Sequence, residues 1–483
     1  MRRYSQPIRV KSTNIPAELL QFVKKDTYSL VIKGAAGTGK TTLSLTILKV
    51  LDIKTNFFYI CTRVSPRQLS ISYPWITRYV ESQREKTPGQ LTTEADVPIN
   101  FEDARLDEPE SLFERITNEL MDVKSPLIII DSWDAVASFM DREARLNNER
   151  VLQTWRERAG AKLIFVNEDP ADNSLESVVD GAIRLDKVEK GNVRFREISL
   201  LKLRGVRIAK PSYLFTLDKS SFRSFQTFNP RNFWIEPDSA DPVHLRNSIR
   251  DTPRTLLEHG HIKSGYDDLD LNLEGGFPRR AVVVLEVGPN ISKQVALVFL
   301  FRLIQMFLAS GNVVFFEPPR ALSLMSANRF TKSCLSIAQS GSGRFFRIGP
   351  QFSDLPQTSP ADSNRNAREN FLNSLTERIT KEQQHNQNKL MLCVLSQDHF
   401  QSLDTHTLLE YLMQTKHTLD LSIIISRESE YFAWSPDIVD LSMKIVVVNG
   451  TLILRTLYRT APVLAIEAEK IVGFPLTNLV PLV

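Results

Sequence analysis

The chain contains little cysteine and lacks any long uninterrupted apolar run. Its three cysteines, Cys61, Cys334 and Cys393, are widely spaced among 483 residues. This odd number matches neither a disulfide framework nor a zinc site and is typical of a reducing cytoplasm. No segment approaches the roughly 18 apolar residues of a membrane-spanning helix, and no apolar core follows the basic start Met1-Arg2-Arg3 as in a secretory signal. We therefore expect a cytoplasmic protein without membrane attachment.

An excess of charge of one sign is also missing. Sixty Lys and Arg residues against 56 Asp and Glu residues leave a formal net charge of +4, which permits contact with nucleic acid but does not indicate it. Hydrophobic residues make up 42% of the chain and charged residues 24%, as in ordinary globular proteins. At this length, two to three domains are expected.

The most informative segment is a phosphate-binding loop. Residues 34–41 read GAAGTGKT, the complete G-x-x-x-x-G-K-T pattern. An apolar run precedes it at 28–32 and another follows at 43–48, which predicts the strand–loop–helix context of a nucleotide site and not a glycine-rich turn. The predicted nucleotide-binding residues are Gly34, Ala35, Ala36, Gly37, Thr38, Gly39, Lys40, Thr41 and Thr42.

Each part of this loop has a chemical role. The glycines let backbone N–H groups converge on phosphate oxygens, where a Cβ would block the approach. Lys40 brings positive charge to the β- and γ-phosphates, and the Thr41 hydroxyl is a ligand for Mg²⁺. The sequence therefore predicts binding of a nucleoside triphosphate, ATP, with Mg²⁺.

A second apolar run ends in a carboxylate. Residues 127–131 read LIIID, and a buried parallel strand here would place Asp131 at the carboxyl edge of the sheet, beside the loop. Such a run is common by itself, but paired with a complete phosphate loop it predicts that Asp131 binds Mg²⁺, directly or through water. Lys40 and Asp131 are thus candidate catalytic residues, and Thr41 and Asp131 are candidate metal ligands.

The same unit occurs a second time in a weakened form. If Lys293 aligns with Lys40, the loop glycines are replaced by Val287, Asn290 and Ser292, and Thr41 by Gln294. Side chains then crowd the backbone cradle and the hydroxyl ligand is lost. We expect a retained fold without nucleotide, the alternative being an altered nucleotide site. The expected domains are 1–219 and 261–483, joined by a Pro-, Asn- and Ser-rich linker at 220–260 with one short helix near 243–249.

Three motifs together resemble the KaiC-like branch of the RecA superfamily: the phosphate loop, the strand that ends at Asp131-Ser132, and Lys202-Leu203-Arg204-Gly205. The tandem layout and the segment 33–37 (KGAAG) are also similar to the gas-vesicle regulator GvpD, a family within that group. The resemblance implies an α/β fold of tandem RecA-like P-loop domains with mostly parallel sheets, the second copy degenerate. It also implies a ring-shaped homo-oligomer in which Lys202 and Arg204 reach the γ-phosphate of the neighbouring subunit, where cations stabilise phosphoryl transfer; the alternative is a solvated charged strand.

The chain departs from this family at one position. KaiC-like ATPases carry paired glutamates just after the second strand, one of which activates water, whereas this chain has Cys61-Thr62-Arg63-Val64-Ser65. Without a general base the attacking water is poorly oriented, so slow hydrolysis is expected. Glu168 and Asp169 are the candidates to replace the missing carboxylate.

Three functions fit these features. The first is an ATP-dependent regulatory switch that a protein partner reads, with transcriptional control implied by the GvpD resemblance. The second is a RecA-type DNA recombination or repair ATPase, which needs a basic groove with aromatic residues. The third is a scaffold without turnover. Basic and aromatic residues that alternate in the linker and would serve the second function are Arg223, Phe225, Phe228, Arg231, Phe233 and Trp234, although such residues more often pack a linker onto a domain.

Overall fold

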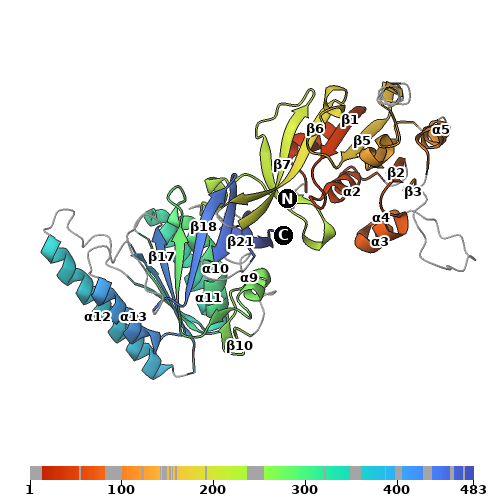
Figure 1. Ribbon diagram of the computed structural model, residues 1–483. Helices are drawn as coiled ribbons and strands as arrows, with labels where there is room; N and C mark the ends of the chain where they lie inside the picture. The colour runs from red at the N-terminus through yellow and green to blue at the C-terminus, as the bar shows by residue number, and fades with distance from the viewer. Residues whose placement is uncertain are drawn as a thin grey trace, which may run out of the picture. The chain divides into compact units, whose positions relative to one another are not determined.

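The computed structural model describes residues 14–53, 56–81, 101–105, 107–120, 124–141, 143, 150–151, 154, 156–157, 160–190, 193–235, 255–319, 322–348, 361–386, 388–397, 405–427, 438–456, 462–471 and 474–483. The chain divides into two compact units, Met1–Gln226 with Leu482–Val483, and Thr227–Pro481. Each unit is an α/β domain built on one large twisted sheet (Figure 1).

Nine strands form the sheet of the first unit within its described residues, in the order β3-β2-β4-β5-β1-β6-β7-β8-β9. The pairs from β3 to β6 are parallel and those from β6 to β9 are antiparallel. The strands are β1 (Tyr28–Lys33), β2 (Phe57–Cys61), β3 (Phe101–Asp103), β4 (Leu127–Asp131), β5 (Lys162–Asn167), β6 (Gly181–Lys190), β7 (Val193–Leu203), β8 (Ser212–Thr216) and β9 (Arg223–Ser224).

Helices cover both faces of this sheet. All six residues of β1 are buried, and they alternate between the faces: Leu30 and Ile32 join one core cluster and Val31 joins the other. Helices α1 (Ala17–Val23) and α2 (Lys40–Val50) pack in the first cluster, and α5 (Pro109–Leu120) and α6 (Trp133–Ala137) in the second. The remaining described helices are α3 (Pro66–Ser72), α4 (Pro74–Glu81), η1 (Leu175–Ser177) and η2 (Asp218–Ser220).

The sheet of the second unit has the same design. Among the described residues its nine strands follow the order β15-β14-β16-β17-β13-β18-β19-β20-β21, parallel up to β18 and antiparallel beyond it. The strands are β13 (Ala281–Val287), β14 (Val313–Phe316), β15 (Arg344–Arg347), β16 (Met391–Ser396), β17 (Leu421–Arg427), β18 (Leu441–Val448), β19 (Thr451–Thr456), β20 (Leu464–Ile471) and β21 (Phe474–Pro481). A small antiparallel sheet precedes it, formed by β10 (Leu257–Glu258), β11 (His261–Ile262) and β12 (Phe277–Pro278).

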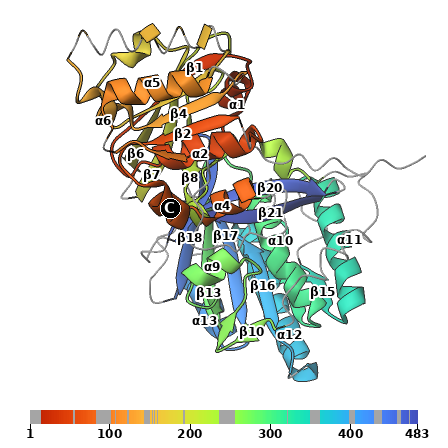
Figure 2. The same ribbon diagram turned by 90° about the vertical axis from the view of Figure 1, so that its right-hand side faces the viewer.

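Two layers of helices again enclose the sheet. Helices α10 (Lys293–Ala309) and α11 (Leu324–Gly341) pack against each other on one face (Figure 2), and α12 (Ala361–His385) and α13 (Thr405–Lys416) lie on the other face (Figure 1). The helix α9 (Asp267–Asn272) and the 3₁₀ turn η3 (Pro230–Phe233) belong to the same unit. Helix α10 is apolar nearly all round, as expected for a helix buried within a domain.

The two strand orders correspond position by position, with β13 in the place of β1 and β16 in the place of β4. Lys40 and Lys293 each begin the helix that follows the central strand, α2 and α10. The predicted α/β class with two mostly parallel sheets is therefore confirmed.

The segment expected to link the domains packs on both units where the structure describes it. Strand β9 extends the first sheet, and Phe222 and Phe225 are buried. Phe233 and Ile235 join the core of the second unit. The short helix expected at 243–249 lies outside the described residues. Within the described part of the chain, no helix is long and apolar enough to cross a membrane, and the three cysteines are free thiols buried in the two units.

Candidate nucleotide-binding site

The phosphate loop joins β1 to α2 and depends on its glycines. Gly34 has a φ of +155°, and a Cβ there would lie 2.4 Å from the carbonyl oxygen of Leu185 in β6. Gly39 precedes α2 in a left-handed conformation, with a φ of +102°. Because any side chain at Gly34 would collide with backbone, the turn requires glycine there. The loop therefore has the conformation that leaves backbone N–H groups open to an anion at the start of a helix.

The Lys40 side chain lies against the phosphate loop. Its Nζ donates hydrogen bonds to the carbonyl oxygens of Gly34 (2.8 Å) and Ala35 (3.1 Å). Burial lowers the pKa of Lys40, while the carboxylates of Glu168 and Asp131 oppose this shift. The ammonium group thus lies on the cradle, bonded to groups that a phosphate can replace.

Asp131 lies beside Thr41, as predicted. The Thr41 hydroxyl donates to Asp131 Oδ2 at 2.7 Å, and the Tyr59 hydroxyl donates to the same oxygen at 2.6 Å. Burial raises the pKa of Asp131, and these two hydrogen bonds act in the opposite direction. A hydroxyl and a carboxylate at the start of the helix are oxygen ligands of the kind Mg²⁺ prefers, so these residues fit the ion.

Two tyrosines support this site, although the sequence does not mark them as functional. Tyr59, in the middle of β2, also lies 3.0 Å from the Ser44 hydroxyl of α2, and Tyr73 lies 2.8 Å from the Thr42 hydroxyl. Thr38 donates to the Ala35 carbonyl oxygen at 2.8 Å and closes the loop on itself. A tyrosine within an apolar strand is typical of a packed core, and only the register of β2 against β4 shows what its hydroxyl contacts.

An arginine occupies the place where the KaiC-like family has glutamates. Arg63, two residues beyond β2, donates from Nε to the Ser132 hydroxyl (3.2 Å), and its Nη2 forms an ion pair with Glu168 (3.0 Å). The Glu168 backbone N–H in turn donates to the carboxylate of Asp134. Three neighbouring strands, β2, β4 and β5, thus bring an arginine and two carboxylates together at the edge where Lys40 lies.

The hairpin of β6 and β7 adds two cations that sequence reasoning missed. Lys187 and Arg196 are directly paired across the strands. Arg196 Nη1 donates to the Gly37 carbonyl oxygen (2.9 Å), and its Nε donates to that of Val483 (2.8 Å). A Cβ on Gly37 would lie 3.4 Å from Lys187 Nζ. Both side chains therefore border the phosphate loop of their own chain, a proximity that the alternating pattern of β7 does not reveal.

Lys202 and Arg204 do not join this cluster. Leu203 pairs with Gly181, which pairs with Leu30, so the end of β7 lies toward the amino end of β1, away from the loop. Lys202 Nζ donates to the carbonyl oxygens of Glu176 (2.9 Å) and Val179 (2.6 Å). Burial, together with the charge of Arg204, lowers the pKa of Lys202.

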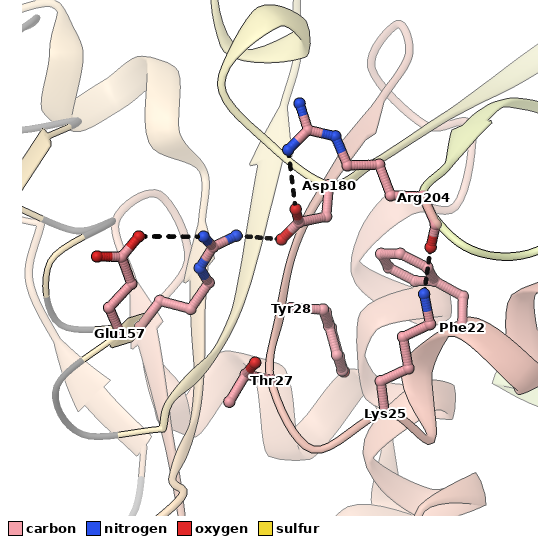
Figure 3. Close-up of a pocket in the computed structure, with 8 residues that line it drawn as sticks. Phe22, Lys25, Thr27, Tyr28, Glu157, Asp180 and Arg204 are labelled. Atoms are coloured by element: carbon pink, nitrogen blue, oxygen red, sulfur yellow. Dashed lines mark hydrogen bonds and ion pairs between the residues drawn. The ribbon is translucent and has the colours of Figure 1, made fainter.

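Arg204 borders a separate cavity of about 280 Å³. It forms an ion pair with Asp180 at 3.3 Å, and its backbone carbonyl oxygen accepts a hydrogen bond from Lys25 (Figure 3). At 60% exposure the Arg204 guanidinium faces solvent. The sheet register thus places Arg204 and Lys40 at opposite ends of β1, so any contact of Arg204 with a γ-phosphate would involve a second subunit.

The corresponding loop of the second unit is filled by its own side chains. Ile291 is 3% exposed, and Ser292 caps α10 by accepting the Gln294 N–H at 3.2 Å. The side chain of Gln294, at the position of Thr41, donates to the Phe233 carbonyl oxygen at 3.1 Å. Lys293 is buried at 1% exposure. A nucleotide would have to displace these groups, which agrees with the expected loss of the second site.

Comparison with known proteins identifies a family that the first unit resembles. Residues 19–203 match the family model described as the GvpD gas vesicle protein, P-loop domain. The chain is 28% identical over 331 residues to the protein GvpD2 of Halobacterium salinarum, across 66% of this chain and 64% of that protein. It is 32% identical over 328 residues to GvpD1 of the same organism, across 63% of this chain and 56% of that protein. Each match covers less than two thirds of the relative's length. Residues 19–203, within the first unit, are therefore similar to the P-loop domain of the GvpD gas vesicle protein family.

Proposed function

We propose that the chain binds ATP with Mg²⁺ in its first unit and acts as a nucleotide-dependent regulatory switch with slow hydrolysis, of the KaiC-like and RecA-like type. The observation that carries this proposal is the preformed loop with Lys40 on its carbonyl oxygens and Thr41 bonded to Asp131. All the groups that a phosphate chain and its metal require lie within one strand–loop–helix segment and at the end of β4, which β5 separates from β1.

On binding, the Lys40 ammonium exchanges the carbonyl oxygens of Gly34 and Ala35 for the β- and γ-phosphate oxygens. Thr41 and Asp131 would hold Mg²⁺, which neutralises charge on the phosphates when bound. The Thr41 hydroxyl and the Asp131 carboxylate, now bonded to each other, would be the groups that hold the ion, and Tyr59 would keep the carboxylate oriented. A bound nucleotide would thereby be linked through Asp131 to β4 and through Tyr59 to β2.

Regulation is favoured over rapid turnover because no carboxylate follows β2, and Arg63 lies there instead. We extend to this chain the gas vesicle association that its family's name carries, with a protein partner that reads the nucleotide state, as in transcriptional control. Lys202 and Arg204 are assigned the contact with the γ-phosphate of a neighbouring subunit in a ring. Support for this comes from their placement away from the loop of their own chain.

Three of the four linker aromatics do not favour the DNA-repair alternative, whereas Trp234 is 50% exposed. Phe225 and Phe233 are 1% and 4% exposed, and Phe228 packs against the core of the second unit. Buried rings cannot stack on bases.

The test is ATP binding and turnover by the purified full chain with Mg²⁺, with molecular mass measured by light scattering in the same buffers. A fluorescent ATP analogue reports binding, and released phosphate reports turnover. Micromolar or tighter binding with turnover near background supports the switch. Absence of binding by wild type refutes the proposal, and rapid turnover without a protein partner would replace the switch by a motor.

A further inference from the structure

The carboxylates of Glu168, Asp131 and Asp134 oppose the lowering of the pKa of Lys40 by burial. Asp131 and Asp134 accept hydrogen bonds from other groups. Asp131 is partly buried and accepts hydrogen bonds from Thr41 and Tyr59. Asp134 is partly buried and accepts the backbone N–H of Glu168. The third, Glu168, is 33% exposed and forms an ion pair with Arg63 through Oε2. This ion pair leaves its second carboxylate oxygen, Oε1, for a water molecule.

The position of Glu168 is fixed at both ends. It directly follows β5, which lies between β4 and β1, so it emerges between Asp131 and the phosphate loop. Asp134 holds its backbone and Arg63 holds its side chain. The charge of Glu168 opposes the lowering of the pKa of Lys40 by burial, so this carboxylate lies near the ammonium group on the loop. A group fixed in this way is preorganised for a water molecule on the far side of that phosphate.

We infer that Glu168 is the carboxylate that orients and deprotonates the attacking water, and that Arg63 is the positioning residue that holds it. The inference rests on the proposed function, because it requires ATP at the first loop. The water oxygen forms a bond to the γ-phosphorus while the bond from that phosphorus to the β–γ bridging oxygen breaks. The electron pair leaves with ADP, and the proton of the water passes to the Glu168 carboxylate and then to solvent. With one carboxylate oxygen bound to Arg63 (3.0 Å), a single oxygen remains for water.

Asp169 is the other candidate from the sequence for the missing carboxylate, but its side chain makes a local hydrogen bond. Its Oδ1 accepts the Ala171 N–H at 2.8 Å and closes a local turn. The variant Asp169→Asn keeps that acceptor and removes the charge. It is therefore a matched control for Glu168→Gln, one residue away along the chain.

The experiment compares single-turnover hydrolysis and nucleotide affinity in full-length wild type, E168Q, D169N, R63M and R63K. We expect E168Q to hydrolyse ATP at least about tenfold more slowly than wild type, with the dissociation constant for the ATP analogue changed by less than about threefold. D169N should match wild type in both. R63M should lose about threefold or more of the rate, and R63K, which keeps a cation, should recover part of it.

Equal rates for E168Q and wild type, with both binding nucleotide, would overturn the inference and leave the proposed function intact. A wild-type rate indistinguishable from that of ATP in buffer would also overturn it. Equal rates for R63M and R63K would remove the positioning role of Arg63. Failure of wild type to bind the analogue would instead refute the proposed function itself, so the two failures are distinguishable.

Discussion

The hydrogen bond from Tyr59 to Asp131 can be removed with little change in shape by Tyr59→Phe. The mutation deletes a donor 2.6 Å from a partly buried carboxylate. Ser44, its other neighbour, keeps a hydrogen bond to the Thr41 carbonyl oxygen at 2.9 Å. A hydrogen bond to a charged group contributes about 1.5–3 kcal/mol, so we expect the first unit to lose about 2 kcal/mol of unfolding free energy near pH 8.

The loss should depend on pH in one direction. Burial raises the folded-state pKa of Asp131, and the bond from Tyr59 opposes that rise. Without Tyr59 the folded pKa rises further, so keeping the carboxylate ionised costs more as pH increases above the ordinary carboxyl range. The difference between wild type and variant is therefore largest near pH 8 and shrinks as pH falls and the folded carboxyl group takes up its proton.

Hydrogen exchange by mass spectrometry in increasing urea, read on peptides from β2 and β4, confines the measurement to the first unit. Tyr73→Phe is the control, because its hydroxyl contacts the neutral Thr42 at 2.8 Å and its loss should be about 1 kcal/mol or less at every pH. In an Asp131→Asn background, Tyr59→Phe should fall to the same range. A loss below about 0.5 kcal/mol near pH 8, or one that is independent of pH, would refute the reasoning.

Three further outcomes follow from the loops and from β7. Lys40→Ala should abolish binding of the ATP analogue while Lys293→Ala leaves it unchanged, and comparable losses would contradict a filled second site. Gly34→Ala should abolish binding as well, since its Cβ would lie 2.4 Å from the Leu185 carbonyl oxygen. The neighbouring variant Ala35→Gly should still bind the analogue. Retained binding by Gly34→Ala would show that the loop has room to move. Arg204→Ala should change the affinity for the ATP analogue by less than about twofold. It should lower the rate of hydrolysis only under conditions in which light scattering shows oligomers. A large loss of affinity would show that Arg204 does not act in hydrolysis alone.

The architecture was predictable from the sequence because its signals are local. The complete phosphate loop, its apolar flanks and the run ending at Asp131 each lie within one short segment, and the strand order places them together. The tandem layout was visible from the weakened second copy of the phosphate loop, and the position of Lys293 at the start of α10 agrees with it.

Other parts of the site were not predictable, because they depend on register between distant strands. Tyr59, Arg63 and Arg196 have no motif, and each contacts the site through a strand pairing that the sequence does not display. Lys202 has a motif, but its ammonium group lies on the carbonyl oxygens of its own unit. A pattern identifies the type of residue that a function needs, and it does not determine the partner that the side chain contacts in a given state.

The two matching strand orders allow the chemistry of the two sheet edges to be compared. In the first unit β4 ends at Asp131, yet no carboxylate follows β2; in the second unit β16 ends at Ser396, yet Glu317 directly follows β14. Each unit thus has an acidic residue at a position where the other has none. The loop positions of the second unit are taken by packing residues such as Ile291. The same strand order therefore carries two chemically different sheet edges.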